Sequence, residues 1–442
     1  MKRKITFIGA GSLGFTRDLA RDILTFEAFQ DCTLSLMDID GKRLEYARRG
    51  VERIVKEKGC QAVVEASTDR RQALKDADGV VITILQGGVN VWRHDIEIPK
   101  KYGVDICVGD TRGPSGIFRF LRTAPVMLDI IRDIEELCPN AIVLNYTNPM
   151  AMLVSYLQAQ TKVSVTGLCH SVQGTAEMLA RWAGGEHGKA EYTCAGINHM
   201  AFYLDFKIDG EDIYPKLREA VLRTEIAREE PVRIEMFRQL GYFPTESSGH
   251  NSEYNPWFRK RPDLVEKYCS TGTGWNPGEY AYILREYLGR EDTWEAEYKD
   301  WLENGEVDLR KGEEYASDIF NAILGNHTPF PFNANIRNHG YITNIDDGAC
   351  VEVPAMAVAE GIVPNGIHTL PQHLSILINH TARIEELAVQ AAMEGDAEKV
   401  FQAVLFDPLT SSVLSMEEIR RMVREMLAVN APYLKYFKNL EI

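Results

Sequence analysis

The sequence predicts an α/β protein in which an N-terminal, doubly wound parallel sheet is joined to a second, mixed α/β domain. Over the first 165 residues, short apolar runs alternate with stretches of helical periodicity. This alternation is typical of right-handed βαβ units, which build a parallel sheet covered by helices on both faces. The alternation ends near residue 165, and no glycine- or serine-rich linker marks the change. We therefore expect one domain over residues 1–165 and another over 166–442, with a rigid interface between them.

The individual elements follow from the apolar periodicity and from the turn residues that interrupt it. In the first domain, strands are expected over residues 4–12, 32–40, 63–69, 78–85 and 141–149, and helices over 13–26, 41–59 and 117–138. In the second domain, strands are expected over 163–168, 201–209 and 342–358. Helices are expected there over 171–185, 212–230, 279–288, 374–395 and 415–432.

Composition limits the possible functions. The 442 residues carry a formal net charge of −15, so no basic stripe remains to bind nucleic acid or an anionic membrane. The N-terminal segment lacks the apolar core of a secretory signal, and no apolar run is long enough to span a bilayer. The eight cysteines stand singly, without CxxC spacing, as is typical of reduced cytosolic proteins. We expect a cytoplasmic protein.

A glycine-rich turn directly follows the first expected strand. Its sequence, GAGSLG over residues 9–14, is a GxGxxG motif between a strand and a helix, where such a turn places a dinucleotide pyrophosphate at a helix N-terminus. Asp38 ends the next strand, where a carboxylate binds ribose hydroxyls and disfavours a 2′-phosphate. The motif predicts a Rossmann-like NAD site; a plain glycine turn beside a surface aspartate is the alternative. The expected cofactor-binding residues are Gly9, Gly11, Ser12, Gly14, Asp38 and Thr83.

A cysteine–histidine pair, Cys169-His170, precedes a helix that Ser171 is expected to cap. The helix N-terminus should lower the pKa of the Cys169 thiol and so favour metal binding. His199 lies in the loop before the strand over 201–209 and is expected at the same crevice. One thiolate and one imidazole suit an open site in which substrate hydroxyls complete an octahedron around Mn²⁺, Fe²⁺, Co²⁺ or Ni²⁺. A buried inert cysteine near an ordinary histidine is the alternative.

Eight segments together resemble glycoside hydrolase family 4, and most closely its α-galactosidases, the melibiases. They are GAGS, LMDID, GDTRGPSGIFRFLRT, NYTNPMAM, GLCHSVQGTAEMLA, AGINHMAFYL, FPTESSGHNSEYNPWF and VEVPAMA. The resemblance implies a lactate/malate dehydrogenase-like fold and a metal-dependent reaction in which NAD⁺ first oxidises carbon 3 of the sugar. The ketone acidifies the carbon-2 proton, a base removes it, and the leaving group departs. Water addition and return of the hydride then regenerate NAD⁺.

The resemblance also assigns roles to residues of this sequence. Cys169 and His199 match the metal ligands. His170 stands where α-specific members place the acid that protonates the leaving oxygen. Tyr254 best matches the base, and His250, also a candidate for binding substrate, is the runner-up. A solvent-facing histidine and an aromatic packing residue are the alternatives for His170 and Tyr254.

Further residues are expected around the sugar. By the same resemblance, Asn148 should hydrogen-bond sugar hydroxyls or the nicotinamide ribose. Asp110 takes the place of a family acidic residue near the metal, where it should act as a catalytic carboxylate or support the metal ligands. Plain turn residues are the alternative for both. Arg93 and Asp95 are expected either to grip the substrate or to form a surface ion pair.

One departure from the α-galactosidase pattern leaves the substrate open. Arg112 and Ser115 stand where those enzymes more often carry an apolar residue and glycine, and an extra cation favours an acidic sugar. α-Galacturonidase is therefore the alternative to an α-galactoside substrate. A 2-hydroxy-acid dehydrogenase is disfavoured because no clear His–Asp pair accompanies Arg93, Arg119 and Arg122; a dinucleotide-sensing protein is the third alternative. We expect a homodimer or homotetramer.

Overall fold

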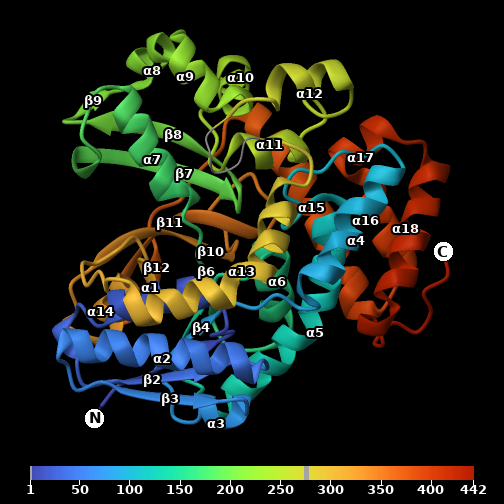
Figure 1. Ribbon diagram of the computed structural model, residues 1–442. Helices are drawn as coiled ribbons and strands as arrows, with labels where there is room; N and C mark the ends of the chain where they lie inside the picture. The colour runs from blue at the N-terminus through green and yellow to red at the C-terminus, as the bar shows by residue number, and fades with distance from the viewer. Residues whose placement is uncertain (1, 273–277) are drawn as a thin grey trace.

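The computed structural model describes residues 2–272 and 278–442, which contain one 12-stranded sheet (Figure 1). Its strand order is β3-β2-β1-β4-β5-β6-β10-β11-β7-β8-β9, and β12 pairs with β11. Neighbours from β3 to β6 are parallel, and the remaining pairs are antiparallel. This confirms the predicted doubly wound parallel sheet with a mixed second part. The strands are β1 (Lys4–Ile8), β2 (Thr33–Met37), β3 (Val63–Ser67), β4 (Gly79–Ile82), β5 (Ile142–Asn145), β6 (Val165–Gly167), β7 (Ala190–Ile197), β8 (Met200–Ile208), β9 (Glu211–Asp212), β10 (Phe330–Arg337), β11 (Cys350–Val358) and β12 (Gly361–Pro364).

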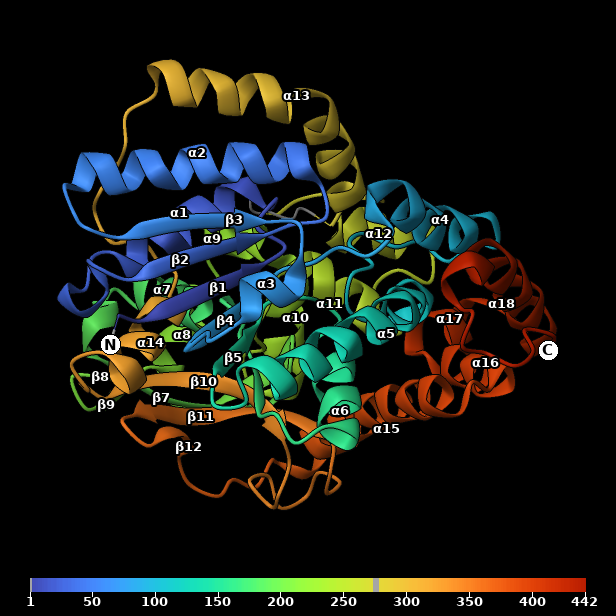
Figure 2. The ribbon, with the colours of Figure 1, turned by 90° about the horizontal axis from the view of Figure 1, so that it is seen from below.

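Helices cover both faces of the parallel strands (Figures 1 and 2). One apolar core joins the sheet to α1, α2 and α14, and another joins it to α4, α5, α6 and the C-terminal helices α15, α16 and α18. The long helix α13 lies along α2, as Figure 2 shows. The helices are α1 (Leu13–Ile23), α2 (Gly41–Lys58), α3 (Arg70–Leu74), α4 (Gly88–Lys101), α5 (Gly113–Leu137), α6 (Met150–Gln160), α7 (Ser171–Trp182), α8 (Tyr214–Ala220), α9 (Thr224–Glu229), α10 (Pro231–Leu240), α11 (Ser248–Tyr254), α12 (Pro262–Tyr268), α13 (Tyr282–Asn304), α14 (Ala316–Leu324), α15 (Gln372–Glu394), α16 (Ala397–Phe406), α17 (Pro408–Val413) and α18 (Met416–Asn430).

Several elements differ from the sequence-based expectation. The apolar patterns do not predict β7 and β10, because polar residues interrupt both strands. The helix expected over 212–230 is two helices, α8 and α9. The strand expected over 342–358 begins only at Cys350, and the helix expected over 279–288 starts at Tyr282 and continues to Asn304.

The sheet continues across the expected domain boundary. Strand β6 pairs with β10 through Gly167 and Asn335, so one sheet carries residues from both parts of the chain. The division at residue 165 stays a prediction. Within the described residues, none of the helices combines the length and apolar character needed to cross a membrane.

Candidate active site

The glycine-rich turn lies where the carboxyl ends of β1, β2 and β4 meet. Gly9 has a φ of +92°, and a Cβ there would lie 2.0 Å from the carbonyl oxygen of Thr83. A Cβ on Gly11 would lie 2.7 Å from Oδ2 of Asp38, which accepts a 2.7 Å hydrogen bond from the Gly11 amide. Glycine is therefore required at position 9, where the contact is with backbone and φ is positive, whereas a side chain at position 11 would displace the Asp38 carboxylate. The structure brings these four predicted residues together.

The first turn of α1 leaves room beside the glycine-rich turn. Ser12 is the N-cap residue, and its side chain makes no capping hydrogen bond. A Cβ on Gly14 would meet nothing within 4 Å, so packing does not demand glycine at this third position. The space suits an anion approaching the helix N-terminus.

Cys169 follows β6 at the same edge of the sheet. Its amide donates to, and its carbonyl accepts from, the hydroxyl of Tyr315, both at 2.9 Å, and its Sγ lies 3.2 Å from Oγ of Ser171. Burial, and then the carboxylates of Glu246 and Glu352, raise the pKa of the thiol well above its usual value. The expected lowering by the helix N-terminus is therefore wrong for the metal-free chain, because burial and negative neighbours outweigh the helix dipole.

His199 occupies the turn between β7 and β8, as predicted. It is buried, and its backbone has a φ of 60°. Its Nδ1 lies 3.1 Å from Oγ1 of Thr111 and 3.3 Å from the hydroxyl of Tyr254. Its Nε2 lies 3.6 Å from Oε2 of Glu246. Burial lowers the pKa of the imidazole, which favours the neutral form that binds metals.

Two overlapping groups of potential metal ligands meet at His199. Cys169, His199 and Glu246 form one group, and Asp110, His199 and His250 form the other; in each, the ligand atoms lie within 4.8 Å of one another. The structure thus brings the two predicted ligands, Cys169 and His199, together. Glu246 was not predicted from the sequence. A signal was present in TESSGHNSEY, where four titratable residues, at positions 246, 250, 253 and 254, recur at helical spacing.

Asp110 and His250 form the second side of this cluster. Nε2 of His250 lies 3.6 Å from Oδ1 of Asp110, and Nδ1 lies 3.1 Å from Oε1 of Glu246. Burial opposes the charge on His250, but the two carboxylates raise its pKa to about 9. Burial also opposes ionisation of Asp110, yet His250 holds the pKa of Asp110 below its usual value. Asn148 donates a 3.4 Å hydrogen bond to Oδ2 of Asp110, so it lies at the cluster; its predicted contact with the sugar or the nicotinamide ribose stays a prediction.

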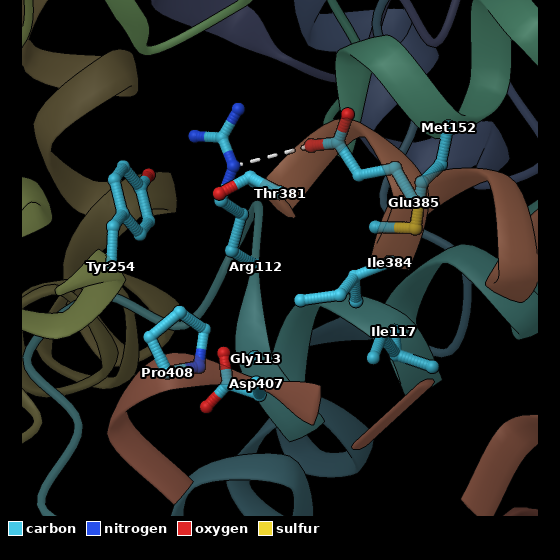
Figure 3. Close-up of a pocket in the computed structure, with 10 residues that line it drawn as sticks. All are labelled: Arg112, Gly113, Ile117, Met152, Tyr254, Thr381, Ile384, Glu385, Asp407 and Pro408. Atoms are coloured by element: carbon cyan, nitrogen blue, oxygen red, sulfur yellow. Dashed lines mark ion pairs between the residues drawn. The ribbon is translucent and has the colours of Figure 1, made fainter. Parts of the chain in front are cut away.

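Tyr254 is buried beside the cluster, with Arg112 against its ring. Figure 3 shows the Arg112 guanidinium between Tyr254 and Glu385. Its Cζ lies 4.7 Å from the ring centroid, its Nε lies 3.2 Å from Oε1 of Glu385, and its Nη2 donates to the carbonyl of Asn198. Burial, and then Asp110, raise the pKa of Tyr254 well above its usual value, while Arg112 opposes this rise.

Glu253 fixes the loop that carries Asp110, a role that the sequence analysis missed. The buried carboxylate on α11 accepts hydrogen bonds of 2.8, 2.9 and 2.9 Å from the backbone amides of Cys107, Val108 and Gly109. Ser115, in the first turn of α5, donates to the carbonyl of Gly109 in this loop. The Ser115 hydroxyl therefore also holds the loop in place.

His170 lies next to the cluster, on a separate set of contacts. Its Nε2 lies 2.9 Å from Oε2 of Glu314, and its ring stacks on Tyr146 at 5.6 Å between centroids. Burial opposes its charge, and Glu314 raises its pKa above the usual value. The expected cap is wrong: α7 begins at Ser171, and the cap position is His170, without a side-chain capping bond.

The expectation for Asp95, that it grips substrate or forms a surface ion pair with Arg93, is wrong. Asp95 is fully buried and binds Arg122 through two hydrogen bonds of 2.9 and 2.5 Å. It therefore neither grips substrate nor forms a surface ion pair. Arg93 lies on α4, and no contact described for it reaches the cluster; its role in substrate binding stays a prediction.

Comparison with known proteins identifies the family of this chain. The chain is 38% identical to an α-galactosidase of Bacillus subtilis (strain 168), over 99% of the chain and 100% of that protein. It is 29% identical to an α-galacturonidase of Thermoanaerobacterium saccharolyticum, over 98% of the chain and 97% of that protein. Its fold matches a 6-phospho-α-glucosidase from gut microorganisms, solved in complex with NAD and Mn²⁺, with a TM-score of 0.82, 21% identity and coverage of 98% and 99%. Residues 4–184 match Family 4 glycosyl hydrolase, and residues 194–410 match its C-terminal domain. The chain belongs to family 4 of the glycosyl hydrolases.

Proposed function

We propose that this protein is a cytoplasmic α-galactosidase that depends on NAD and on a divalent cation, with Mn²⁺ as the expected ion. One observation carries the proposal: the dinucleotide-type glycine turn follows β1, and Cys169, the thiol of a thiol–imidazole–carboxylate cluster, follows β6 at the same carboxyl edge of the parallel strands. Ligands bind at this edge in doubly wound folds. The α-galactosidase at 38% identity over both full lengths supports the substrate class.

The residues present fit both cofactors. The turn at Gly9 and Gly11 has no room for side chains, and Asp38 stands beside it to bind ribose hydroxyls. Cys169 and His199 offer the sulfur and nitrogen ligands of an open metal site. When bound, NAD⁺ supplies a hydride acceptor and the divalent cation a Lewis acid for a keto sugar.

The side chains around that site have distinct tasks. Tyr254, as its phenolate, takes the carbon-2 proton and becomes the neutral phenol. Because burial raises the pKa of Tyr254, the phenolate would form only beside the added positive charge of a bound cation. His170, whose charged form is held by Glu314, donates a proton to the leaving oxygen. Asp110 and Asn148, linked by a hydrogen bond, bind and orient sugar hydroxyls.

The contacts of Arg112 favour a neutral sugar over an acidic one. The guanidinium packs against Tyr254, pairs with Glu385 and donates to a backbone carbonyl. A cation already paired with a buried carboxylate adds little attraction for a sugar carboxylate. We therefore place galactosides ahead of galacturonides.

The test is an assay on aryl α-galactoside with and without NAD⁺, Mn²⁺ and a thiol reductant, beside aryl α-galacturonide and the aryl β-galactoside. We expect cleavage of the α-galactoside that requires all three additions and accumulates no NADH. Activity that survives removal of NAD⁺ would refute the mechanism. Net NADH formation with a 2-hydroxy acid would instead support a dehydrogenase. NAD binding without cleavage of any glycoside would support a dinucleotide-sensing protein.

We also propose that the enzyme is a homodimer or homotetramer. Large apolar side chains are exposed on its C-terminal helices, including Ile376 at 68% and Phe406 at 55%, and association would remove such area from water. Light scattering coupled to size-exclusion chromatography measures the mass directly; a monomer at micromolar concentration would contradict the proposal.

A further inference from the structure

We propose that Glu246 is a third protein ligand of the catalytic cation, which rests on the function proposed above. Glu246 lies in the segment between α10 and α11, far in sequence from Cys169 and His199, yet its carboxylate shares one cluster with their ligand atoms. It is 8% exposed. An ionised carboxylate is expensive to bury unless a positive charge or a metal accompanies it.

Backbone strain marks the same two residues that face each other. His199 and Glu246 have φ values of 60° and 67°, in the left-handed region, which residues other than glycine seldom adopt and in which histidine is more frequent than glutamate. Such strain costs on the order of 1–3 kcal/mol per residue and persists where a site requires it. Here it directs Nε2 of His199 and Oε2 of Glu246 to a separation of 3.6 Å.

That separation is suitable for two ligands of one ion. Two atoms bound at about 2.1 Å on adjacent corners of a coordination shell lie about 3 Å apart, and on opposite corners a little over 4 Å. The 3.6 Å between Nε2 of His199 and Oε2 of Glu246 falls between these two values. With Sγ of Cys169 included, the three ligand atoms all lie within 4.8 Å of one another, a limit close to the larger value. A thiolate and a carboxylate together would neutralise a divalent charge and leave three positions for sugar hydroxyls and water in an octahedral shell.

The neighbouring carboxylates are less suited to this role. Glu352 is fully buried, accepts a 3.3 Å hydrogen bond from Asn335, and belongs to neither group of potential ligands found among the described residues. Asp110 already receives hydrogen bonds from Thr111 and Asn148. Glu246 instead faces the two histidines of the cluster.

The experiment measures metal binding by the full-length protein without sugar, by isothermal titration with Mn²⁺ and with Cd²⁺ and by the electron spin resonance of Mn²⁺. Glu246→Gln should weaken Mn²⁺ binding on the order of 100-fold or more, since even residues behind the ligands cost 10–100-fold. Cd²⁺ binding should fall less, because the remaining thiolate is a soft ligand and the lost carboxylate a hard one. Glu352→Gln is the matched control, with a loss of less than about 10-fold in Mn²⁺ affinity.

A second variant guards against misfolding. Glu246→Gly removes the carboxylate and relieves the left-handed strain, so it should unfold at the same or a higher temperature and still lose Mn²⁺ affinity. Unchanged Mn²⁺ affinity in either variant at position 246, or equal losses for Mn²⁺ and Cd²⁺, would overturn the assignment. If the unmodified protein did not bind Mn²⁺ at all, the proposed function itself would be refuted. The titration of the unmodified protein would show this before either variant is tested.

Discussion

The nucleotide turn and the metal cluster are built in different ways. Gly9 and Gly11 are close in sequence, Asp38 ends the next strand along the chain, and the pairing of β1 with β2 together with the backbone of the turn determines their arrangement. The cluster joins Asp110, Cys169, His199 and Glu246 from separate loops, and the side chain of Glu253 holds the loop before Asp110. The turn should therefore lose NAD⁺ affinity when a single Cβ is added. The cluster should lose metal binding and catalysis when a ligand or a supporting contact is removed, while NAD⁺ binding stays intact.

The largest expected effect is the loss of turnover in Cys169→Ser. A serine hydroxyl replaces the thiolate ligand, so hydrolysis of aryl α-galactoside should fall by on the order of 10³-fold or more. NAD⁺ affinity, measured by calorimetry, should stay nearly unchanged because the glycine turn is a separate structure. Equal loss of catalysis and NAD⁺ binding would point to a folding role for Cys169. It would also contradict the view that the nucleotide turn and the metal cluster are separate structures.

Gly9→Ala tests the nucleotide turn. The added Cβ would lie 2.0 Å from the carbonyl oxygen of Thr83, and alanine would have to adopt a φ of +92°. We therefore expect the free energy of unfolding to fall by about 2–3 kcal/mol. NAD⁺ affinity should fall at least about 10-fold. Gly14→Ala is the matched control, since its Cβ meets nothing within 4 Å. Urea denaturation and calorimetry compare the two; equal behaviour would contradict the steric explanation.

The pH dependence of the free energy of unfolding tests whether His250 is charged within the cluster. In metal-free protein, Glu246 and Asp110 raise the pKa of His250 from 6.5 to about 9 against the effect of burial. This stabilisation is fully present below pH 6.5 and is lost as pH rises through 9, and amounts to about 3 kcal/mol at most. Urea denaturation of the wild type and of His250→Asn should therefore show a difference that shrinks between pH 6.5 and 9.5. A difference that stays constant would mean that His250 is not charged.

The smallest effect is expected on substrate choice in Arg112→Leu. Breaking a buried pair costs about 3–5 kcal/mol, and the additional change Glu385→Leu should recover most of that stability. The ratio of kcat/KM for galactoside and galacturonide should change by less than about threefold, because the guanidinium contacts Tyr254 and Glu385. A large shift in this ratio would show that Arg112 contacts the sugar.

Much of the fold and part of the site could be read from the sequence. Alternating strands and helices, and the glycines after β1, follow from local periodicity and from backbone conformations that neighbouring residues impose. The strands β7 and β10 escaped prediction because polar residues break their apolar runs. Glu246 and Glu253 escaped because a carboxylate in TESSGHNSEY has the same local appearance whether it faces solvent or a buried cluster.

The sequence by itself determined the parallel sheet, the dinucleotide-type turn and the presence of a thiol and an imidazole suited to a metal. The tertiary structure decided which side chains accompany them: Glu246 and His250 at His199, Glu253 on the loop before Asp110, and Arg112 paired with Glu385. The reason is physical. Backbone conformation depends on residues a few positions apart, whereas the pKa values and contacts of a buried cluster depend on segments that only folding brings within a few ångströms.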